Sequence, residues 1–330
     1  MPLLPANPVD SLWWASEKLR TRIVAGPEAV LKDRGLTPPP EMSAATLLEY
    51  IQLTHLLWMD GKLVSIEDFR IDPADEGLLL GKGVWESTKT MNHVPWLWTM
   101  HCDRMVQSAK VLGIKLSAEQ LPTTEQVTEY AKALTQDDIL LRLNATAGRP
   151  GGPGLVWMSA SPLPKYPDDV RLRTVKNPVR KGQPYLLLKT FHYAARLQVG
   201  HASTADGYDS ALMLDDDDNM LEAAHANIFI RYPDGWATPV ADGGFLPGTL
   251  RQVILDRGPM PVSAKVLHVG TLATAREVFV TNSNAGIVPI TQIDGYRFRV
   301  GPETLAHQAW LNSAGVSRSR YVFSAPAAPA

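Results

Sequence analysis

Residues 185–193 read YLLLKTFHY, an apolar run that ends in a lysine. The run has the length and composition of a buried strand, so we expect a strand that stops at Lys189. An ammonium group is costly to bury without a partner. Lys189 therefore either reaches solvent where the strand ends or performs chemistry, and other parts of the chain are needed to choose between these explanations.

A carboxylate lies within a second apolar run. The segment DDDDNMLEAAHANIFI, residues 215–230, indicates a polar turn followed by a strand that contains Glu222. A carboxylate in such a strand needs a cationic group opposite it. The four aspartates at 215–218 lack the spacing of a calcium-binding loop, so we expect a solvated turn and no metal.

Two later segments have the features of an anion site. GGFLPGTLRQVI, residues 243–254, opens a helix after glycine and proline, which leaves backbone N–H groups free at its N-terminus. EVFVTNSNAGIVPI, residues 277–290, ends a strand in small polar residues that complete an anion cradle. Pyridoxal 5′-phosphate requires all these features together, because its aldehyde needs a lysine, its pyridine nitrogen a carboxylate and its phosphate an anion site.

The composition is that of an ordinary globular protein. The chain has 330 residues, 45% of them hydrophobic and 20% charged, with a formal net charge of -2. This balance argues against nucleic acid as a partner. Cys102 is the only cysteine, which fits a reducing compartment. The N-terminus does not resemble a signal peptide and no run of 18 apolar residues occurs, so we expect a cytoplasmic protein that makes no membrane contact.

Changes in composition predict five segments. We expect a helical extension at 1–55, a small α+β domain at 56–162, a linker at 163–168, a larger cofactor-binding α/β domain at 169–322 and a flexible tail at 323–330. The linker is rich in proline and charge, and apolar residues at helical spacing, as in SLWWASEKLRTRIV (11–24), support the extension.

The order of four motifs resembles a known family. Lys189, LEAAHANIFI, FLPGTLR and VFVTNSNAGIVPI follow one another as in the class IV, fold type IV, pyridoxal-phosphate aminotransferases. That family includes branched-chain aminotransferases, D-amino-acid aminotransferases, (R)-selective amine transaminases and aminodeoxychorismate lyases. The resemblance runs from about Leu57 to Leu311 and implies a two-domain α+β or α/β architecture, here with an extra N-terminal helical segment.

The resemblance implies roles for the residues that contact the cofactor. Lys189 would form the Schiff base and shuttle protons, Glu222 would bind the pyridine nitrogen, and Tyr193 matches a tyrosine that contacts the cofactor's phenolic oxygen. Those that would bind the phosphate are Arg104 in the helix HCDRMVQSA, the backbone of Thr249 and Leu250, and the side chains of Ser283 and Asn284. The family usually has threonine at the position of Leu250.

Structural explanations stay open beside these roles. Glu222 is also explained as an ion-pair partner, Arg104 as a surface arginine and Tyr193 as a packing residue. We assign no role to His192 or His225.

Substrate residues are expected in the first domain. Arg142 resembles an arginine that binds a substrate carboxylate in the branched-chain group, and Lys89 and Arg149 are further candidates for such a contact. Trp85 is a candidate for the side-chain pocket. A structural role for each of these four residues is equally compatible with the sequence.

The implied reaction is a ping-pong Schiff-base transamination between an amino acid (branched-chain-like) or amine donor and an α-keto acid. Three alternatives stay open: an (R)-amine or D-amino-acid transaminase, an enzyme like aminodeoxychorismate lyase, and a cofactor-binding or interaction protein without catalysis. The family resemblance also implies a homodimer.

Overall fold

The computed structural model describes residues 32, 37, 43–178 and 182–313. The helix expected at 11–24 and the tail expected at 323–330 lie outside the described residues, so both stay predictions. Within these residues, no helix is long and apolar enough to cross a membrane.

The first half of the structure is a six-stranded antiparallel sheet with the strand order β2-β1-β6-β5-β3-β4. Its elements are α3 (Ala44–Thr54), β1 (Leu56–Met59), β2 (Lys62–Ser65), α4 (Glu76–Leu80), β3 (Gly83–Met91), β4 (Val94–Pro95), α5 (Trp98–Val111), η2 (Ala118–Gln120), α6 (Thr124–Leu134), β5 (Ile139–Thr146) and β6 (Val156–Pro162).

Local sequence signals account for these elements. The β1–β2 turn uses Asp60 and Gly61 at positive φ, and the β3–β4 turn uses Asn92 and His93 in the same region, as their turn-forming residue types predict. Thr123 caps α6 by accepting a hydrogen bond from the backbone of Gln126. These turns and the cap were predicted from the sequence and are confirmed.

The second half is a mixed nine-stranded sheet with the order β12-β11-β10-β13-β14-β7-β8-β9, and β15 pairs with β14. Its elements are β7 (Val170–Lys176), η3 (Pro184–Leu187), α7 (Ala194–Ala205), β8 (Ser210–Leu214), β9 (Met220–Ala223), β10 (Asn227–Tyr232), β11 (Gly235–Pro239), α8 (Thr249–Arg257), β12 (Val262–Lys265), η4 (Val269–Thr274), β13 (Glu277–Asn282), β14 (Gly286–Ile293), β15 (Tyr296–Arg297) and α9 (Pro302–Leu311).

Two strand expectations in this half were wrong. Residues 184–187 form the 3-10 turn η3 and not a strand, with Pro184 in its first turn, where proline's fixed φ favours a helical turn. The run 220–232 is two strands, β9 and β10, separated at residues 224–226. Both changes alter which side chains face the space between the halves.

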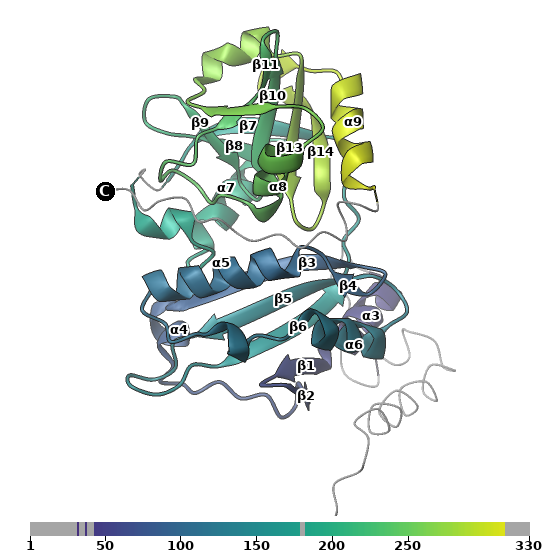
Figure 1. Cartoon of the computed structure of the whole chain (residues 1–330), viewed down its shortest axis with the longest axis vertical. Helices are drawn as coiled ribbons and strands as arrows, with labels where there is room; N and C mark the ends of the chain where they lie inside the picture. Colours follow the sequence, from purple (N-terminus) through teal and green to yellow (C-terminus); the bar gives the residue numbers. More distant parts are fainter. Residues whose placement is uncertain (1–31, 33–36, 38–42, 179–181, 314–330) are drawn as a thin grey trace, which may run out of the picture.

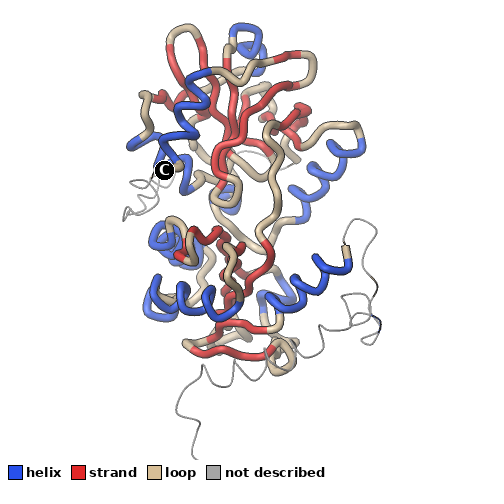
Figure 2. Tube along the Cα trace, turned by 90° about the vertical axis from the view of Figure 1, so that its right-hand side faces the viewer, coloured by secondary structure: helices blue, strands red, loops and turns tan. Residues whose placement is uncertain are grey.

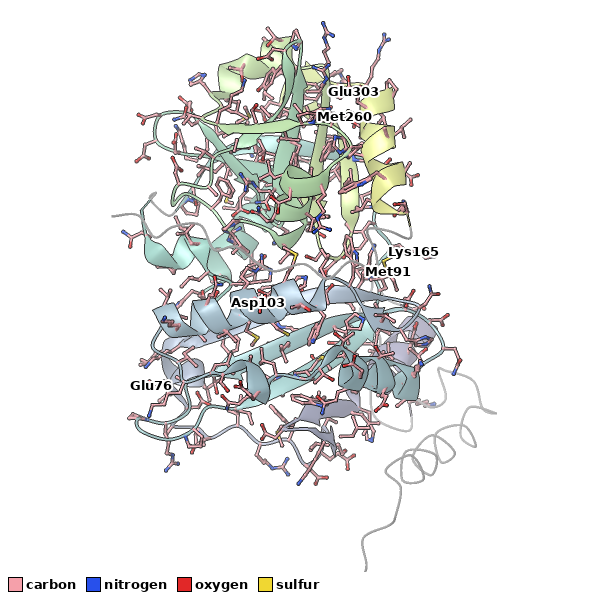
Figure 3. The ribbon with its side chains drawn as sticks, in the orientation of Figure 1. Glu76, Met91, Asp103, Lys165, Met260 and Glu303 are labelled. Carbon is pink, nitrogen blue, oxygen red and sulfur yellow. The ribbon has the colours of Figure 1, made fainter. Side chains whose placement is uncertain are left out.

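The two halves meet across α5 (Figures 1 and 2). This helix lies on the face of the first sheet that points toward the second half, and Asp103 marks it at this junction in Figure 3. Each half has its own buried cluster of apolar side chains. The α+β class expected from the sequence is confirmed, whereas the domain boundaries stay a prediction.

Candidate active site

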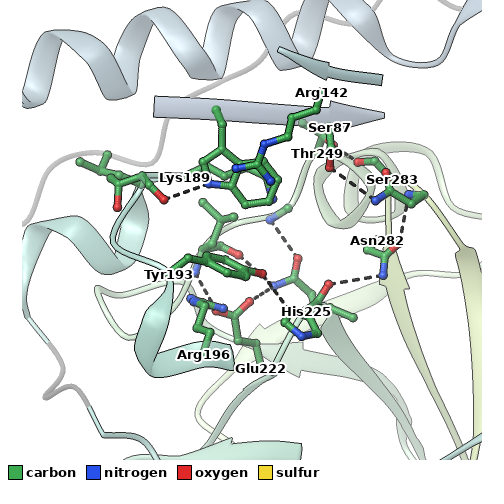
Figure 4. A pocket seen from close by; sticks show the side chains of 18 of the residues that line it. Ser87, Arg142, Lys189, Tyr193, Arg196, Glu222, His225, Thr249, Asn282 and Ser283 are labelled. Atoms are coloured by element: carbon green, nitrogen blue, oxygen red, sulfur yellow. Dashed lines mark hydrogen bonds and ion pairs between the residues drawn. The ribbon is translucent and has the colours of Figure 1, made fainter. Parts of the chain in front are cut away.

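A cavity of about 560 Å³ lies between the two halves. Its walls come from β3, β5 and β6 of the first half, and from residues 185–196, the β9–β10 turn, the start of α8 and the β13–β14 turn of the second. Figure 4 shows the side chains that converge there. A volume of this size is typical of pockets that hold a small ligand or cofactor.

Lys189 enters the cavity directly after η3. The backbone N–H of Trp85 donates to the Lys189 carbonyl oxygen at 2.9 Å, and the indole N–H of Trp85 donates to the Thr190 carbonyl, also at 2.9 Å. The Lys189 ammonium lies 4.0 Å from the centre of the Trp85 ring. Burial lowers the pKa of Lys189 to about 7, so its ammonium loses a proton more readily than that of an ordinary lysine. The contacts with Trp85 fix the position of this residue.

Glu222 lies at the bottom of the same cavity and is 3% exposed. One carboxylate oxygen accepts hydrogen bonds from Arg196 Nη2 at 2.5 Å and from the backbone N–H of Leu246 at 3.2 Å. The other accepts from Asn227 Nδ2 at 3.2 Å. Burial raises the pKa of Glu222, and Arg196 opposes that shift. The cationic partner expected from the sequence is therefore Arg196, supplied by α7.

The start of α8 forms a group of hydrogen-bond donors beside the cavity, which we call the α8 cup: Thr249, Leu250 and Ser283. No hydrogen bond within the described residues uses the backbone N–H of Thr249 or Leu250. The Thr249 hydroxyl lies 2.9 Å from that of Ser283. Free N–H groups at a helix N-terminus beside two hydroxyls favour an anion.

Arg104 is held at the α8 cup by a buried ion-pair cluster. Its Nε and Nη2 donate to the two oxygens of Glu86 at 2.7 Å each, and its Nη1 donates to the Pro247 carbonyl at 3.2 Å. His101 Nδ1 lies 2.7 Å from the same carboxylate. Burial opposes ionisation of Glu86, but Arg104 and His101 outweigh it and hold the pKa of Glu86 at about 2.

The charges around the cavity favour an anionic ligand. Among the described residues that line it, Glu222 is the only acidic one. Five cationic residues line it: Arg104, Arg142, Lys189, Arg196 and Arg251. Arg251 is 4% exposed, and its Nε has no hydrogen-bond partner within the described residues; the same holds for the Thr281 hydroxyl. Unpaired buried polar atoms and excess positive charge fit a phosphate-bearing cofactor here.

Arg142 is positioned for a ligand at the opposite wall. Its guanidinium stacks 3.9 Å from the Trp85 ring, and its Nε donates to Asn144 Oδ1 at 3.0 Å. It forms no ion pair within the described part of the chain. An arginine fork without a carboxylate partner suits a substrate carboxylate.

Most of the predicted site residues converge, and two do not. The residues that line the cavity are Trp85, Arg104, Arg142, Lys189, Tyr193, Glu222, Thr249, Leu250, Ser283 and Asn284. Lys89 and Arg149 are not among the lining residues. Arg149 instead pairs with Asp72 at 2.5 Å, and the Lys89 ammonium lies 5.1 Å from the Trp96 ring.

Four polar residues of the site and of the ion-pair cluster behind it were not predicted from the sequence: Glu86, His101, Arg196 and Arg251. His225 was named from the sequence but given no role. Glu86 alternates with Trp85 in β3, so its carboxylate faces α5 while the indole faces the cavity. Glu86 could have been found from the sequence, because it is a charged residue at a position of the strand that is expected to be buried. Arg196 and Arg251 gave no such signal, because ordinary amphipathic helices also contain arginines.

The model of the family described as amino-transferase class IV matches residues 83–293. The chain belongs to this family. It is therefore an enzyme of the aminotransferase type.

Relatives in this family have several activities. The chain is 29% identical over 257 residues to a putative branched-chain-amino-acid aminotransferase of Methanocaldococcus jannaschii, covering 72% of this chain and 88% of the relative. It is 24% identical over 275 residues to the aminodeoxychorismate lyase of Bacillus subtilis, covering 77% and 92%. Family membership therefore leaves the substrate open.

A solved structure shares the fold. The branched-chain aminotransferase of Thermoproteus uzoniensis, determined with norvaline, matches with a TM-score of 0.71 and 26% identity, covering 80% of this chain and 96% of that chain. The fold type IV architecture expected from the resemblance is confirmed.

Proposed function

We propose that this chain is a pyridoxal 5′-phosphate-dependent transaminase that acts on an α-amino acid and an α-keto acid. The observation that carries the proposal is one cavity that holds a desolvated lysine, a buried carboxylate and the α8 cup. A lysine with a pKa near 7 is available at neutral pH both as a nucleophile toward an aldehyde and as a base.

The residues around the cavity match the cofactor group by group. Lys189 would hold its aldehyde carbon, Glu222 its pyridine nitrogen, and the α8 cup together with Arg104 its phosphate. When bound, the cofactor supplies an electron sink for charge that develops at the substrate's α-carbon. The closed ion-pair cluster behind Arg104 fixes the guanidinium before the cofactor arrives, which reduces the entropy lost on binding.

Lys189 and Glu222 would divide the proton chemistry between them. Neutral Lys189 Nζ would take the proton from the α-carbon of the donor in one half-reaction, and in the other it would give a proton to the α-carbon of the product amino acid. Glu222, which pairs with Arg196, would accept a hydrogen bond from a protonated pyridine nitrogen and so favour that protonated form. The Trp85 ring, whose centre lies 4.0 Å from Lys189 Nζ, covers one side of this nitrogen.

Arg142 supports an amino acid over a simple amine as donor. Its guanidinium lines the cavity and has Asn144 as its hydrogen-bond partner, so a substrate carboxylate would complete its pairing. We infer that this carboxylate lies between Arg142 and Lys189, with the donor's side chain against Trp85 and Tyr193.

The test is an absorbance spectrum of the cofactor-loaded protein before and after adding L-amino acids, D-amino acids and (R)-amines. We expect one amino-acid class to convert the cofactor to its pyridoxamine form with release of the matching keto acid. A Lys189→Ala variant should show no conversion. Conversion by (R)-amines alone would overturn the role of Arg142.

A second candidate is a lyase, favoured by the similarity to the Bacillus subtilis protein. The same spectra distinguish it, because a lyase releases its product without leaving the cofactor in the pyridoxamine form. Aminodeoxychorismate is the probe for this arm, and pyruvate release is its readout.

A further inference from the structure

Tyr193 and His225 form a hydrogen-bonded pair at the cavity wall (Figure 4). The Tyr193 hydroxyl lies 2.8 Å from His225 Nδ1. The two rings are stacked, with centroids 5.7 Å apart and an interplanar angle of 22°. Tyr193 also forms a T-shaped ring contact with Trp85, and the Lys189 ammonium lies over the Trp85 ring. His225 thus contacts, through one phenol, the aromatic group that supports Lys189.

The break between β9 and β10 accounts for the position of His225. Ala223 and Ala226 form a bridge in which the Ala223 N–H donates to the Ala226 carbonyl at 2.8 Å. The residues between them leave the strand, and His225 contacts Tyr193, the N-cap residue of α7. In a continuous strand, its side chain would follow the alternation of the sheet instead.

The chemistry of pyridoxal phosphate places one oxygen near this pair, if the proposed function holds. In the pyridine ring of this cofactor, the carbon that carries the aldehyde is opposite the nitrogen. One of its neighbouring carbons carries the hydroxyl, and the other carries the phosphate arm. If Lys189 holds the aldehyde, Glu222 the nitrogen and the α8 cup the phosphate, the hydroxyl would be left to the remaining wall. Figure 4 shows Tyr193 on the side of the cavity away from Thr249 and Ser283.

A phenol has one hydrogen to donate, so its partners determine where that hydrogen points. If His225 accepts it, Tyr193 offers the cavity only lone pairs. If His225 Nδ1 carries a hydrogen and donates it to Tyr193, the phenol hydrogen is free for the cofactor. The phenolic oxygen of the cofactor would be anionic when bound. A Tyr193 hydroxyl that donates its hydrogen to this oxygen, while His225 donates to Tyr193, is therefore the favourable arrangement.

The surroundings of His225 disfavour a charged imidazole. Burial lowers the pKa of His225, and the nearby cations Arg196 and Lys189 lower it further. Glu222 is engaged by Arg196, Leu246 and Asn227. A neutral imidazole donates from one nitrogen only, so a single tautomer decides the direction of the Tyr193 hydroxyl.

We propose that His225 is a positioning residue that donates a hydrogen bond from Nδ1 to the Tyr193 oxygen. The hydrogen of the Tyr193 hydroxyl is then directed at the phenolic oxygen of the cofactor. This inference rests on the proposed function. It goes beyond it by assigning a role to a histidine that touches neither substrate nor reacting atoms.

The test is a pH titration of the absorbance of the cofactor-loaded protein without substrate. A hydrogen bond to the ring oxygen favours the form in which that oxygen bears the full negative charge, so its loss raises the titration midpoint. We expect His225→Phe, which keeps a stacked ring, to raise the midpoint by about one pH unit. His225→Asn keeps an N–H near the place of Nδ1, so its midpoint should lie at least halfway back from the His225→Phe value to the wild-type value.

Tyr193→Phe provides the matched control. In that background His225→Phe should cause no further shift, because the phenol it acts through is absent. An unchanged midpoint in His225→Phe, or an equal shift with and without the Tyr193 hydroxyl, would overturn the inference alone. A wild-type protein that binds no cofactor would overturn the proposed function and the inference together. Thermal unfolding of each cofactor-free variant shows that the fold is retained.

Discussion

At the scale of single residues, the desolvated ammonium of Lys189 makes stability depend on pH. Its pKa is about 7 in the folded protein and 10.5 for an ordinary lysine. Between these values the unfolded chain binds a proton that the folded chain does not, so this contribution to stability rises with pH. Below pH 7 the folded protein carries the buried charge and is destabilised most.

A Lys189→Met variant should therefore be stabilised more at pH 6 than at pH 9. Methionine has a similar volume and no charge, so the gain measures the cost of the ammonium. Thermal unfolding of the cofactor-free proteins at both pH values provides the comparison. Equal gains at the two pH values would show that the Lys189 ammonium is solvated.

Two arginines of the first half offer a matched test of substrate binding. Arg142 lines the cavity, whereas Arg149 is not among the lining residues and pairs with Asp72. We expect Arg142→Met to raise the KM for the amino and keto acids about 10- to 100-fold, since a charge-assisted hydrogen bond is lost. Arg149→Met should leave KM within twofold. Steady-state kinetics with the amino acid and the keto acid varied in turn measures these KM values. Equal KM changes in the two variants would refute the assignment of Arg142 to the substrate.

Sequence reasoning reached the residues whose setting is unusual in itself. Lys189 and Glu222 stood out because each interrupts an apolar run. His225 did not, since a histidine in a strand is ordinary until a tertiary contact gives it a partner. That partner, Tyr193, is 32 positions away in the chain, and such contacts leave no local pattern.

At the scale of elements, Gly248 determines where α8 begins. Its N–H donates to Asn227 Oδ1 at 2.9 Å, and Asn227 also reaches Glu222. A Cβ at Gly248 would lie 2.2 Å from that oxygen, closer than side-chain atoms approach. The glycine thus couples the α8 cup to the carboxylate across the cavity.

We expect Gly248→Ala to weaken cofactor binding at least about tenfold, because the Asn227 hydrogen bonds must shift. Gly295→Ala is the control, since a Cβ there meets nothing within 4 Å. Equilibrium titration with pyridoxal phosphate measures both. Unchanged affinity in the Gly248→Ala variant would show that the start of α8 does not bind the cofactor.

Elements with strong local signals were predictable, and the segment before Lys189 was not. The turn at Asn92, the cap at Thr123 and the opening of α8 after Gly248 each depend on nearby residues. The run 185–188 has no such signal except Pro184, and its apolar residues suit a strand or a 3-10 turn equally. The residues that follow this turn pair with β3 at the Val84–Thr190 bridge, a contact between distant parts of the chain that no local pattern indicates.

At the scale of the whole molecule, three consecutive leucines on α4 are exposed. Leu78, Leu79 and Leu80 have exposed fractions of 58%, 64% and 62%. The C-cap of α4, Gly81, lies against His192, which lines the cavity. An exposed apolar run beside a pocket is typical of an interaction surface, and the family resemblance implies a homodimer.

We expect the protein to be a dimer in light scattering, and Leu79→Asp to shift it toward monomer. Leu305→Asp, on α9, introduces the same charge at a position that is 52% exposed and should leave the dimer intact. A monomeric wild-type protein would contradict the dimer, and equal effects of both variants would place the interface elsewhere.

The most direct test of the central claim is to locate the cofactor on the chain. The protein is loaded with pyridoxal phosphate, reduced with borohydride, digested and mapped by mass spectrometry. We predict a pyridoxyl group on Lys189, in the peptide that contains YLLLKTFHY, and no such group in a Glu222→Ala variant loaded at limiting cofactor. Labelling of another lysine, or no labelling of the wild-type protein, would contradict it.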